Sequence, residues 1–223
     1  MHLYGSTASP FVQRVLMAAR VKGHELELRF PPGEGGMKSA EFREFNPLGR
    51  IPVLAFDDGG HLCESEAIAG YLDETLDGPS LLPGDALARA RVREIVAVTT
   101  LEFATAIRPM MVHLVFRMGD APMVIEAARR QAEKGLDALD RLIANDPSRG
   151  QRETLDAADC VLVPILTLAE LIEPMTGVAT LVRARAALSA YWSRIVDDPV
   201  ARGTVDEMRA GFAAIMARNA PAG

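Results

Sequence analysis

The sequence predicts an α/β domain built on a small mixed sheet, followed by a second domain made only of helices. Strand and helix patterns alternate through residues 1–77, whereas no strand pattern follows residue 84. Residues 78–84 are rich in glycine and proline, which is typical of a connection between domains. The 223 residues also exceed the roughly 100 to 200 residues of one domain. We therefore expect domains at residues 1–77 and 85–223, joined by a linker at 78–84.

The first domain has four predicted strands and two predicted helices. The strands are expected at residues 1–4, 25–30, 52–56 and 61–63. One helix begins at Pro10, between the first two strands, and a strand-helix-strand unit makes those strands parallel neighbours. Residues 57–60 (DDGG) join the last two strands as an antiparallel hairpin, and the second helix begins at Ser65. The result is a mixed four-stranded sheet with helices on its faces.

The second domain is predicted to be a set of amphipathic helices around one apolar helix. One helix covers residues 85–107 and is expected to stop or kink before Pro109, because proline cannot donate to the helical ladder. Residues 156–159 (DAAD) resemble a capping box and open a helix that is apolar nearly all round, as a central helix should be. The other helices are expected to begin at Pro122 and to cover residues 180–196 and about 200–218, before a frayed tail at 219–223.

The composition argues against a nucleic-acid or membrane protein. The net charge is −6, and the 24 basic residues are scattered along the chain. The longest apolar run, residues 160–168, is much shorter than the roughly 20 residues of a membrane span, and no signal peptide is seen. Cys63 and Cys160 lie far apart in apolar patterns, which predicts buried thiols and neither a disulfide nor a zinc site. We expect a soluble, cytoplasmic protein without a metal.

The most informative stretch is residues 46–72, which contains the hairpin and the start of the second helix. Pro52 gives the sheet no N–H, so the first residues of its strand are free to pair with something other than a neighbouring strand. Ser65 is a favoured N-cap, and a helix N-terminus attracts anions through its free N–H groups and its dipole. The carboxylate of Glu64 beside it could hold an ammonium group. Together these features suit the head group of an amino acid.

These residues resemble the cytosolic glutathione S-transferases. The most specific match is N-P-x-G-R-I-P-V-L at residues 46–54, followed by C-E-S at 63–65. The segment S-P-F-V-Q-R-V-L at 9–16 adds to it, and residues 156–159 match the helix-capping element of the family, with Asp in place of the usual Ser or Thr. The resemblance covers nearly the whole chain. It implies a thioredoxin-like first domain, an all-α second domain, and a homodimer that pairs the first domain of one subunit with the second domain of the other.

The resemblance also implies a glutathione site built from five residues. The Ile51-Pro52 peptide bond would be cis, and the Ile51 backbone would pair with the cysteinyl backbone of glutathione. Glu64 and Ser65 would hold the amine and the carboxylate of the γ-glutamyl group. Arg50 would face the glycyl end, although an arginine in a turn could equally be a solvated surface charge.

Ser9 stands where serine-type members of the family, similar to the tau and phi classes, place the hydroxyl that supports the glutathione thiolate. A free thiol has a pKa of about 8.5, so a hydroxyl that donates to the sulfur, beside the positive end of the helix at Pro10, would favour the reactive thiolate. Ser9 would stabilise the thiolate and would not itself be a nucleophile. Thr7 is the alternative hydroxyl in the same loop, and Ser9 could also act only as the N-cap.

The second substrate is expected to bind in an apolar pocket that contains Phe11, Met110, Met111 and His113. Flexible methionines suit a pocket that accepts varied shapes. His113 could instead be an ordinary core or surface histidine.

The favoured function is glutathione transfer to small apolar electrophiles. One alternative is a glutathione-dependent isomerase or lyase, similar to zeta-class relatives, in which glutathione adds to the substrate and leaves again. Another is a binding or stress protein that keeps the glutathione fold without catalysis, although the intact glutathione motif argues against it. The chemistry of glutathione transfer requires no metal.

Overall fold

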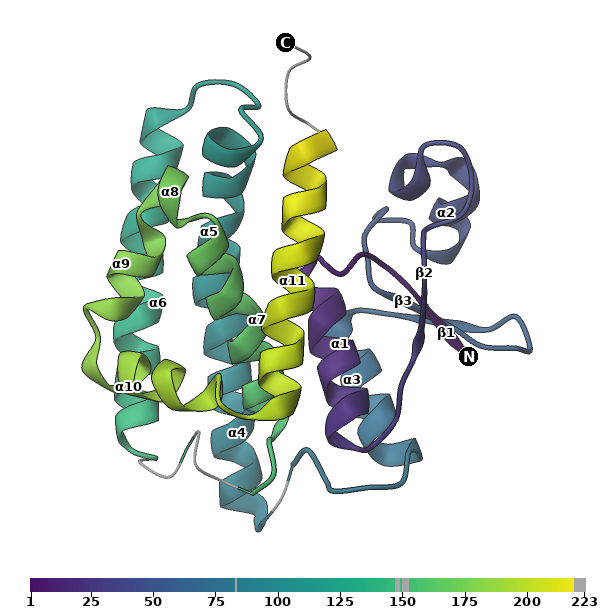
Figure 1. Cartoon of the computed structure of the whole chain (residues 1–223), viewed down its shortest axis with the longest axis horizontal. Helices are drawn as coiled ribbons and strands as arrows, with labels where there is room; N and C mark the ends of the chain where they lie inside the picture. The colour runs from purple at the N-terminus through teal and green to yellow at the C-terminus, as the bar shows by residue number, and fades with distance from the viewer. Residues whose placement is uncertain (83, 147–148, 150–152, 219–223) are drawn as a thin grey trace. The chain divides into compact units, whose positions relative to one another are not determined.

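The computed structural model, which describes residues 1–82, 84–146, 149 and 153–218, shows a chain that divides into two compact units (Figure 1). The first is formed by residues 1–81 together with the chain from Asp206 onward, and the second by Leu82–Val205. The division falls inside the predicted linker. The grouping of the end of the last helix with the N-terminal unit has no counterpart in the sequence patterns. The predicted frayed tail, residues 219–223, lies outside the described residues.

The first unit contains the predicted mixed sheet of four strands, in the order β2-β1-β3-β4. The strands are β1 (His2–Tyr4), β2 (Glu27–Arg29), β3 (Val53–Ala55) and β4 (His61–Cys63). β1 pairs in parallel with β2 and antiparallel with β3, and β3 pairs antiparallel with β4. A helical crossover therefore joins the parallel pair, and the predicted hairpin joins β3 to β4.

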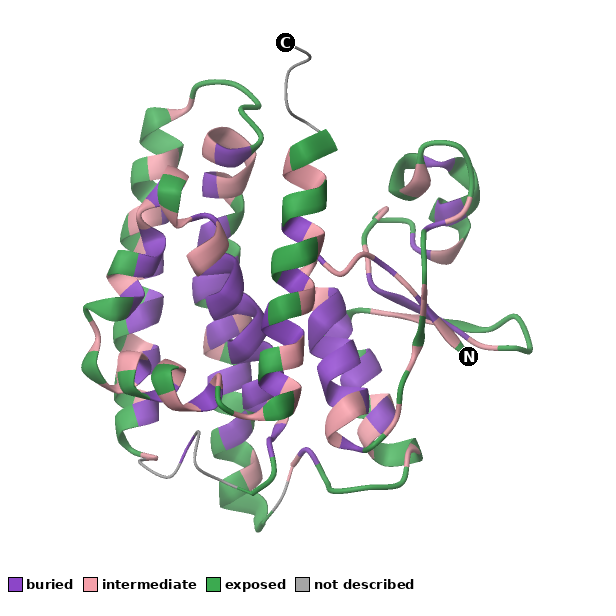
Figure 2. Ribbon diagram, in the orientation of Figure 1, coloured by how far each residue is buried: buried purple, intermediate pink, exposed green. Residues whose placement is uncertain are grey.

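Two helices of the first unit, α1 (Pro10–Val21) and α3 (Ser65–Thr75), pack apolar side chains onto this sheet. The unit has further helical segments besides these two, namely the 3₁₀ turn η1 (Gly36–Lys38), α2 (Ala40–Phe45) and the end of α11 (Pro199–Arg218). Figure 2 shows α1 buried along most of its length. The core cluster joins β1, β3, α1 and α3 through Leu3, Val12, Val15, Leu16, Ala19, Leu54, Ile68 and Leu72. Each buried Leu, Ile or Val side chain contributes about 1.5 to 3 kcal/mol, so this cluster holds α1 and α3 against the sheet.

The second unit contains only helices among its described residues, as predicted. They are α4 (Ala86–Val98), η2 (Thr99–Ala104), α5 (Thr105–Met110), η3 (Met111–Val115), α6 (Pro122–Ala144), α7 (Ala157–Leu171), α8 (Glu173–Thr176), α9 (Val178–Arg183), α10 (Ala186–Ile195) and the start of α11. The long helix α6 packs against η2, α5 and α10.

Of the predicted stop or kink before Pro109, the stop is wrong, because the helix that begins at Ala86 runs on to Val115. Pro109 lies inside α5, and the flanking segments η2 and η3 have π-helical geometry. Ile107 and Met110, near the proline, are 1% and 2% exposed. Packing of these neighbours holds the helix together across a residue that cannot donate a hydrogen bond.

The same helix, Ala86–Val115, is long and apolar enough to cross a membrane by length and composition alone. Its most apolar window has a hydropathy of 1.4, and 44% of that window is buried within the protein. The longest apolar run of the sequence, residues 160–168, lies in a different helix, α7. A core helix of a soluble protein passes the same test, so a single helix of this kind is weak support for a membrane span.

The helix α7 begins with the predicted capping box. The Asp156 carboxylate accepts hydrogen bonds from the N–H groups of Ala158 and Asp159, at 2.8 and 3.2 Å. In return, the Asp159 carboxylate accepts from the Asp156 N–H at 3.0 Å. Every residue from Ala158 to Ala169 is buried, so the box supplies partners to N–H groups that water does not reach.

A buried ion cluster surrounds this cap. Arg149 is 1% exposed and binds both oxygens of Asp156, at 2.8 and 2.9 Å, and one oxygen of Asp159, at 3.1 Å. The Tyr191 hydroxyl donates to Asp159 at 3.0 Å. Burial, together with the charge of Asp156, raises the pKa of Asp159 to about 6. The sequence motif identifies the two aspartates, but not Arg149 or Tyr191, which complete the cluster.

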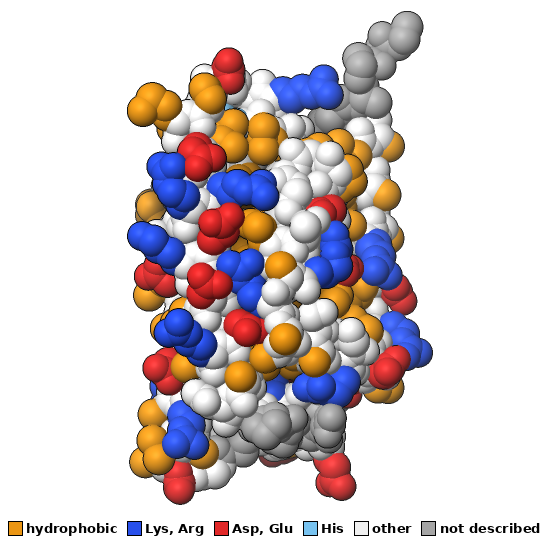
Figure 3. Space-filling view, turned by 90° about the vertical axis from the view of Figure 1, so that its left-hand side faces the viewer, with side chains coloured by type: hydrophobic (Ala, Val, Ile, Leu, Met, Phe, Trp, Pro, Cys, Tyr) orange, Lys and Arg blue, Asp and Glu red, His pale blue; other side chains and the backbone are white. Residues whose placement is uncertain are grey.

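One exposed face of the second unit carries interspersed charges of both signs (Figure 3). On α6, Arg130 Nη1 lies 2.9 Å from Glu126 Oε1, and Arg129 Nε lies 3.8 Å from Glu133 Oε1. Exposed pairs four residues apart on a helix contribute only about 0.3 to 0.5 kcal/mol, so these two pairs add little to the stability of the fold.

Candidate active site

Three segments that carry predicted site residues leave the sheet at one edge. Tyr4, at the end of β1, pairs with Val53, at the start of β3, and Val53 pairs with Cys63, at the end of β4. Because both pairings are antiparallel, the loop after β1, the turn before β3 and the helix start after β4 share that edge. The register therefore brings together the segments that hold Ser9, the Arg50-Ile51-Pro52 turn and the Glu64-Ser65 helix start.

The loop after β1 is a tight turn that ends at the N-cap of α1. The N–H of Ser9 donates to the Ser6 carbonyl at 3.0 Å, and Pro10 occupies the first helical position. The Ser9 hydroxyl accepts from the Val12 N–H at 3.4 Å, which is beyond the usual 2.7 to 3.2 Å of such bonds. The cap is therefore weak, and the hydroxyl retains the capacity to donate a hydrogen bond to a ligand.

The rival hydroxyl of Thr7 has different surroundings. It lies against Gly211 of α11, where an added Cβ would come within 2.4 Å of Thr7 Oγ1. The backbone carbonyl of Thr7 accepts a hydrogen bond from the Gln13 side chain at 3.0 Å. Ser9 thus stands at the positive end of α1, whereas Thr7 is packed against the last helix.

The turn before β3 is held by a buried asparagine. The Ile51-Pro52 peptide bond is cis, as predicted. Asn46, only 3% exposed, donates from Nδ2 to the Arg50 carbonyl at 2.8 Å and accepts from the Leu48 N–H at 3.0 Å. Asn46 was part of the matched motif but had no role in the sequence analysis. The sequence does contain a signal for this role, because Asn46 stands directly before a proline in a turn. At such a position an asparagine side chain commonly forms a hydrogen bond with the backbone two residues further on.

The two cysteines differ in burial. Cys160 is buried as predicted, but Cys63 is only partly buried, so that half of the prediction is wrong. The Cys63 thiol donates to the Phe45 carbonyl at 3.4 Å, which ties β4 to the end of α2. Burial, with a contribution from the neighbouring Glu64, raises the pKa of the Cys63 thiol. Both cysteines are free thiols.

Glu64 has an unusual backbone conformation. Its φ of 68° is positive, which side-chain-bearing residues rarely adopt. Such a conformation costs about 1 to 3 kcal/mol and concentrates at functional sites. Glu64 is exposed directly before α3, and the following Ser65, the first residue of the helix, is 6% exposed. Arg50 is exposed in the preceding turn.

The predicted second-substrate residues belong to both units. Phe11 is a partly exposed residue of α1 in the first unit. In the second unit, Met110 is 2% exposed and part of the core, whereas Met111 and His113 are partly exposed. The Nδ1 atom of His113 lies within hydrogen-bond distance, 3.1 Å, of the Gly119 carbonyl. The pocket itself stays a prediction.

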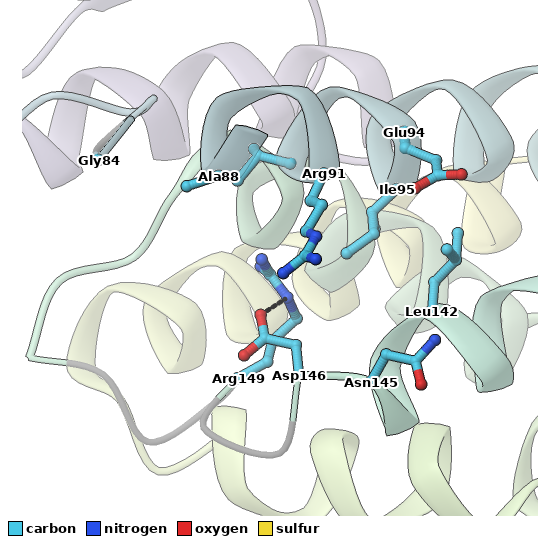
Figure 4. A pocket seen from close by; sticks show the side chains of 10 residues that line it. Gly84, Ala88, Arg91, Glu94, Ile95, Leu142, Asn145, Asp146 and Arg149 are labelled. Atoms are coloured by element: carbon cyan, nitrogen blue, oxygen red, sulfur yellow. Dashed lines mark ion pairs between the residues drawn. The ribbon is translucent and has the colours of Figure 1, made fainter. Parts of the chain in front are cut away.

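A cavity of about 640 Å³ lies in the second unit between α4 and the end of α6 (Figure 4). None of the predicted site residues lines it. Arg91, Glu94, Asp146 and Arg149 contribute its charged side chains, and Arg149 Nε lies 3.3 Å from an Asp146 oxygen. The cavity therefore borders the buried ion cluster of α7. Within the described part of the chain, no group of three His, Cys, Asp or Glu side chains could hold a metal ion.

Comparison with known proteins gives consistent matches. The family model described as "Glutathione S-transferase, N-terminal domain" matches residues 8–75. Maleylacetoacetate isomerase of Pseudomonas aeruginosa is 32% identical over 175 residues, covering 76% of this chain and 82% of that protein. Probable maleylacetoacetate isomerase 1 of Drosophila melanogaster is 29% identical, and the match covers 73% of this chain and 66% of the fly protein.

The solved structures agree with these matches. Glutathione transferase F7 from Populus trichocarpa superimposes with a TM-score of 0.77 at 25% identity, covering 93% of this chain and 98% of that one. A thioredoxin-like domain with a cis-proline turn, followed by helices, is the class of protein that the fold and this edge of the sheet define. The chain belongs to the glutathione S-transferase family, as its motifs predicted.

Proposed function

We propose that this protein is a glutathione transferase, which activates the thiol of bound glutathione for attack on small apolar electrophiles. The observation that carries the proposal is the strand register, which gathers Ser9, the cis-proline turn and Glu64-Ser65 at one edge of the sheet. These groups complement the thiol, the peptide backbone and the amino-acid head of glutathione.

Binding would use backbone as well as side-chain groups. The N-terminus of α3 and the Ser65 hydroxyl would hold the γ-glutamyl carboxylate, and the Glu64 carboxylate would hold the ammonium. The Ile51 backbone would pair with the cysteinyl residue, since Ile51 lies just before β3, whose strand pairings begin at Val53. Arg50, which is exposed, is assigned to the glycyl carboxylate.

The chemistry requires a thiolate. Ser9 would donate its hydroxyl proton in a hydrogen bond to the sulfur, beside the positive end of α1, and so lower the thiol pKa from about 8.5. The thiol proton passes to solvent. The sulfur then forms a bond with the electrophilic carbon, and the leaving group departs with its electron pair. The packing of Thr7 against Gly211 supports Ser9 over Thr7 in this role.

The remaining assignments extend the same proposal. Phe11, Met110, Met111 and His113 would line the pocket for the electrophile, and the protein would act as a cytoplasmic homodimer. Family membership supports the dimer, whose unlike domains would pair across the subunits. Light scattering at micromolar concentration should give twice the 24.0 kDa of one chain, and a monomeric mass would contradict the dimer.

A second candidate is a glutathione-dependent isomerase. It is favoured by the relatives, because the Pseudomonas aeruginosa protein bears the name maleylacetoacetate isomerase. In such a reaction the thiolate adds to a carbon–carbon double bond, the resulting single bond rotates, and the thiolate leaves as the double bond forms again. Glutathione is regenerated, whereas conjugation consumes one thiol for each product.

The two reactions are separated by counting thiols. The protein is first tested for retention on immobilised glutathione. It is then incubated with glutathione and 1-chloro-2,4-dinitrobenzene. In a separate reaction it is incubated with glutathione and a cis-configured maleyl acid. Loss of one thiol and release of one chloride per product support the transferase. Conversion of the cis acid to the trans acid without thiol loss supports the isomerase. A protein that binds glutathione but catalyses neither reaction would contradict both.

Replacing Glu64 by glycine should weaken glutathione binding and stabilise the fold. Loss of the carboxylate removes a hydrogen bond to a charged group, which is worth about 1.5 to 3 kcal/mol, or roughly ten- to a hundredfold in affinity. Glycine also relieves the positive φ of 68°, which should raise the free energy of unfolding by about 1 kcal/mol. Calorimetric titration and urea unfolding measure the two effects.

Glu64→Ala is the matched control, because it removes the carboxylate and keeps the strained backbone. It should lose the same affinity without the gain in stability. Ser65→Ala should likewise weaken binding by roughly tenfold or more. Unchanged glutathione affinity in Glu64→Ala and Ser65→Ala would remove both residues from the site.

A further inference from the structure

The last helix touches the loop that carries Ser9. The part of α11 from Asp206 onward belongs to the first unit, where Glu207 and Gly211 are four residues apart and therefore lie on one face of the helix. Both contact the loop or its immediate support. A segment from the end of the chain thus forms one wall of the candidate thiolate site.

Gly211 is the point of closest approach. A Cβ at this position would lie 2.4 Å from Thr7 Oγ1 and 2.7 Å from Ala8 N. Both distances are too short for a Cβ contact, so a side chain at position 211 would force the helix or the loop to move. Alanine is the better helix former, so a glycine within a helix lowers its stability. At position 211 a glycine is required by space, because only a residue without a side chain lets the α11 backbone rest on Thr7 and Ala8.

Glu207 supplies a second hold on the same loop. Gln13 of α1 is 0% exposed, and its Nε2 donates to the Thr7 carbonyl at 3.0 Å and to Glu207 Oε2 at 3.2 Å. The other carboxylate oxygen of Glu207 accepts from Arg20 Nη2 at 2.7 Å. The carboxylate therefore orients the Gln13 amide, which in turn fixes the backbone of Thr7.

We propose that Gly211 and Glu207 are positioning residues that set the Thr7-Ala8-Ser9 backbone so that the Ser9 hydroxyl faces the glutathione sulfur. This inference rests on the proposed function, because it takes Ser9 as the group that stabilises the thiolate. The Ser9 N–H is bonded to Ser6 across this short turn, at 3.0 Å, so a displacement at Thr7 or Ala8 moves Ser9 as well. The pKa of the bound thiol therefore depends on the last helix.

The primary test is Gly211→Ala. The ultraviolet absorbance of the glutathione thiolate in the complex is followed against pH, together with kcat and the KM for glutathione. We expect the apparent pKa of the bound thiol to rise by about one unit in the variant. At a pH below the thiol pKa of both the wild type and the variant, kcat should therefore fall about tenfold. Activity should approach that of the wild type as the pH rises above the new pKa. The KM for glutathione should change less than about twofold, because Glu64 and Ser65 are untouched.

Gly203 provides a matched control in the same helix. Its Cβ would meet nothing within 4 Å, so Gly203→Ala makes the same chemical change without a contact on the loop. The thiolate titration of Gly203→Ala should coincide with that of the wild type. A shift of equal size in both variants would mean that helix propensity, and not the contact with Thr7 and Ala8, sets the pKa.

Glu207 provides a second route if Gly211→Ala does not fold. Glu207→Ala removes one of the two acceptors of the Gln13 amide, whereas Glu207→Gln keeps one carbonyl oxygen in reach of it. We expect a raised thiol pKa in Glu207→Ala and a value near the wild type in Glu207→Gln. A merely structural role would lower the melting temperature of both variants and leave the titration where it was.

The outcomes separate this inference from the proposed function. A wild type that lowers the thiol pKa of glutathione, with an unmoved titration in Glu207→Ala and in folded Gly211→Ala, would overturn the positioning role and leave the transferase proposal intact. A wild type that does not bind glutathione would overturn both.

Discussion

Replacing Ser9 by alanine should lower kcat at neutral pH by about ten- to a hundredfold, with a smaller effect on glutathione affinity. A hydrogen bond to a charged group is worth about 1.5 to 3 kcal/mol, which corresponds to roughly one to two units in the pKa of the bound thiol. The thiolate absorbance of the complex should therefore titrate at higher pH. The weak cap to Val12, at 3.4 Å, predicts a loss of stability below about 1 kcal/mol.

Thr7→Ala is the comparison that assigns the hydroxyl. Thr7 lies in the same loop and loses the same group, but its Oγ1 is packed against Gly211. We expect its thiolate titration to match the wild type. An unmoved titration in Ser9→Ala together with a raised one in Thr7→Ala would transfer the role to Thr7. If neither variant moves the titration, no hydroxyl of this pair supports the thiolate, and the N-terminus of α1 remains as the source of activation.

The first unit could be predicted because its signals are local. Alternation in residues 25–30 and the DDGG turn at 57–60 depend on neighbours in sequence, and the structure contains the corresponding strands. The failed stop at Pro109 shows the opposite case. The proline rule is local too, but burial of Ile107 and Met110 comes from tertiary packing and outweighs the lost hydrogen bond.

In the candidate site too, features marked by a local motif could be predicted, whereas contacts between distant residues could not. The cis bond before Pro52 followed from a contiguous motif, and the strand register explains why distant motifs share one edge. The contact of Gly211 with Thr7 joins opposite ends of the chain, so no local pattern marks it. The positive φ of Glu64 also escaped prediction, because sequence rules expect such backbone at glycine or asparagine.

Replacing Arg149 by methionine should lower the free energy of unfolding by about 3 to 5 kcal/mol. The guanidinium is buried and binds Asp156 and Asp159 at 2.8 to 3.1 Å, so its removal takes away a cation that both buried carboxylates bind. Breaking a buried ion pair from one side has an effect of this size, because the remaining charge stays desolvated. Urea unfolding followed by circular dichroism measures the change.

Arg202→Met is the matched surface control. Arg202 pairs with Asp197 at 3.4 Å, with side chains that are 59% and 82% exposed. Water screens such a pair, so the variant should lose less than about 1 kcal/mol. Equal losses in the two variants would mean that burial does not decide the contribution of Arg149.

The Arg149 variant should also depend on pH in a defined direction. The folded pKa of Asp159, about 6, is above its ordinary value of 3.8, so the folded state binds the proton more tightly. The contribution of Asp159 to the free energy of unfolding is therefore fully present below pH 3.8, and it is lost as the pH rises from there through about 6. Arg149 opposes the rise in pKa, so Arg149→Met should lose more stability at pH 8 than at pH 4.5. Asp159→Asn should remove the wild-type loss through pH 6, and an unchanged pH profile in that variant would rule out Asp159 as the titrating group.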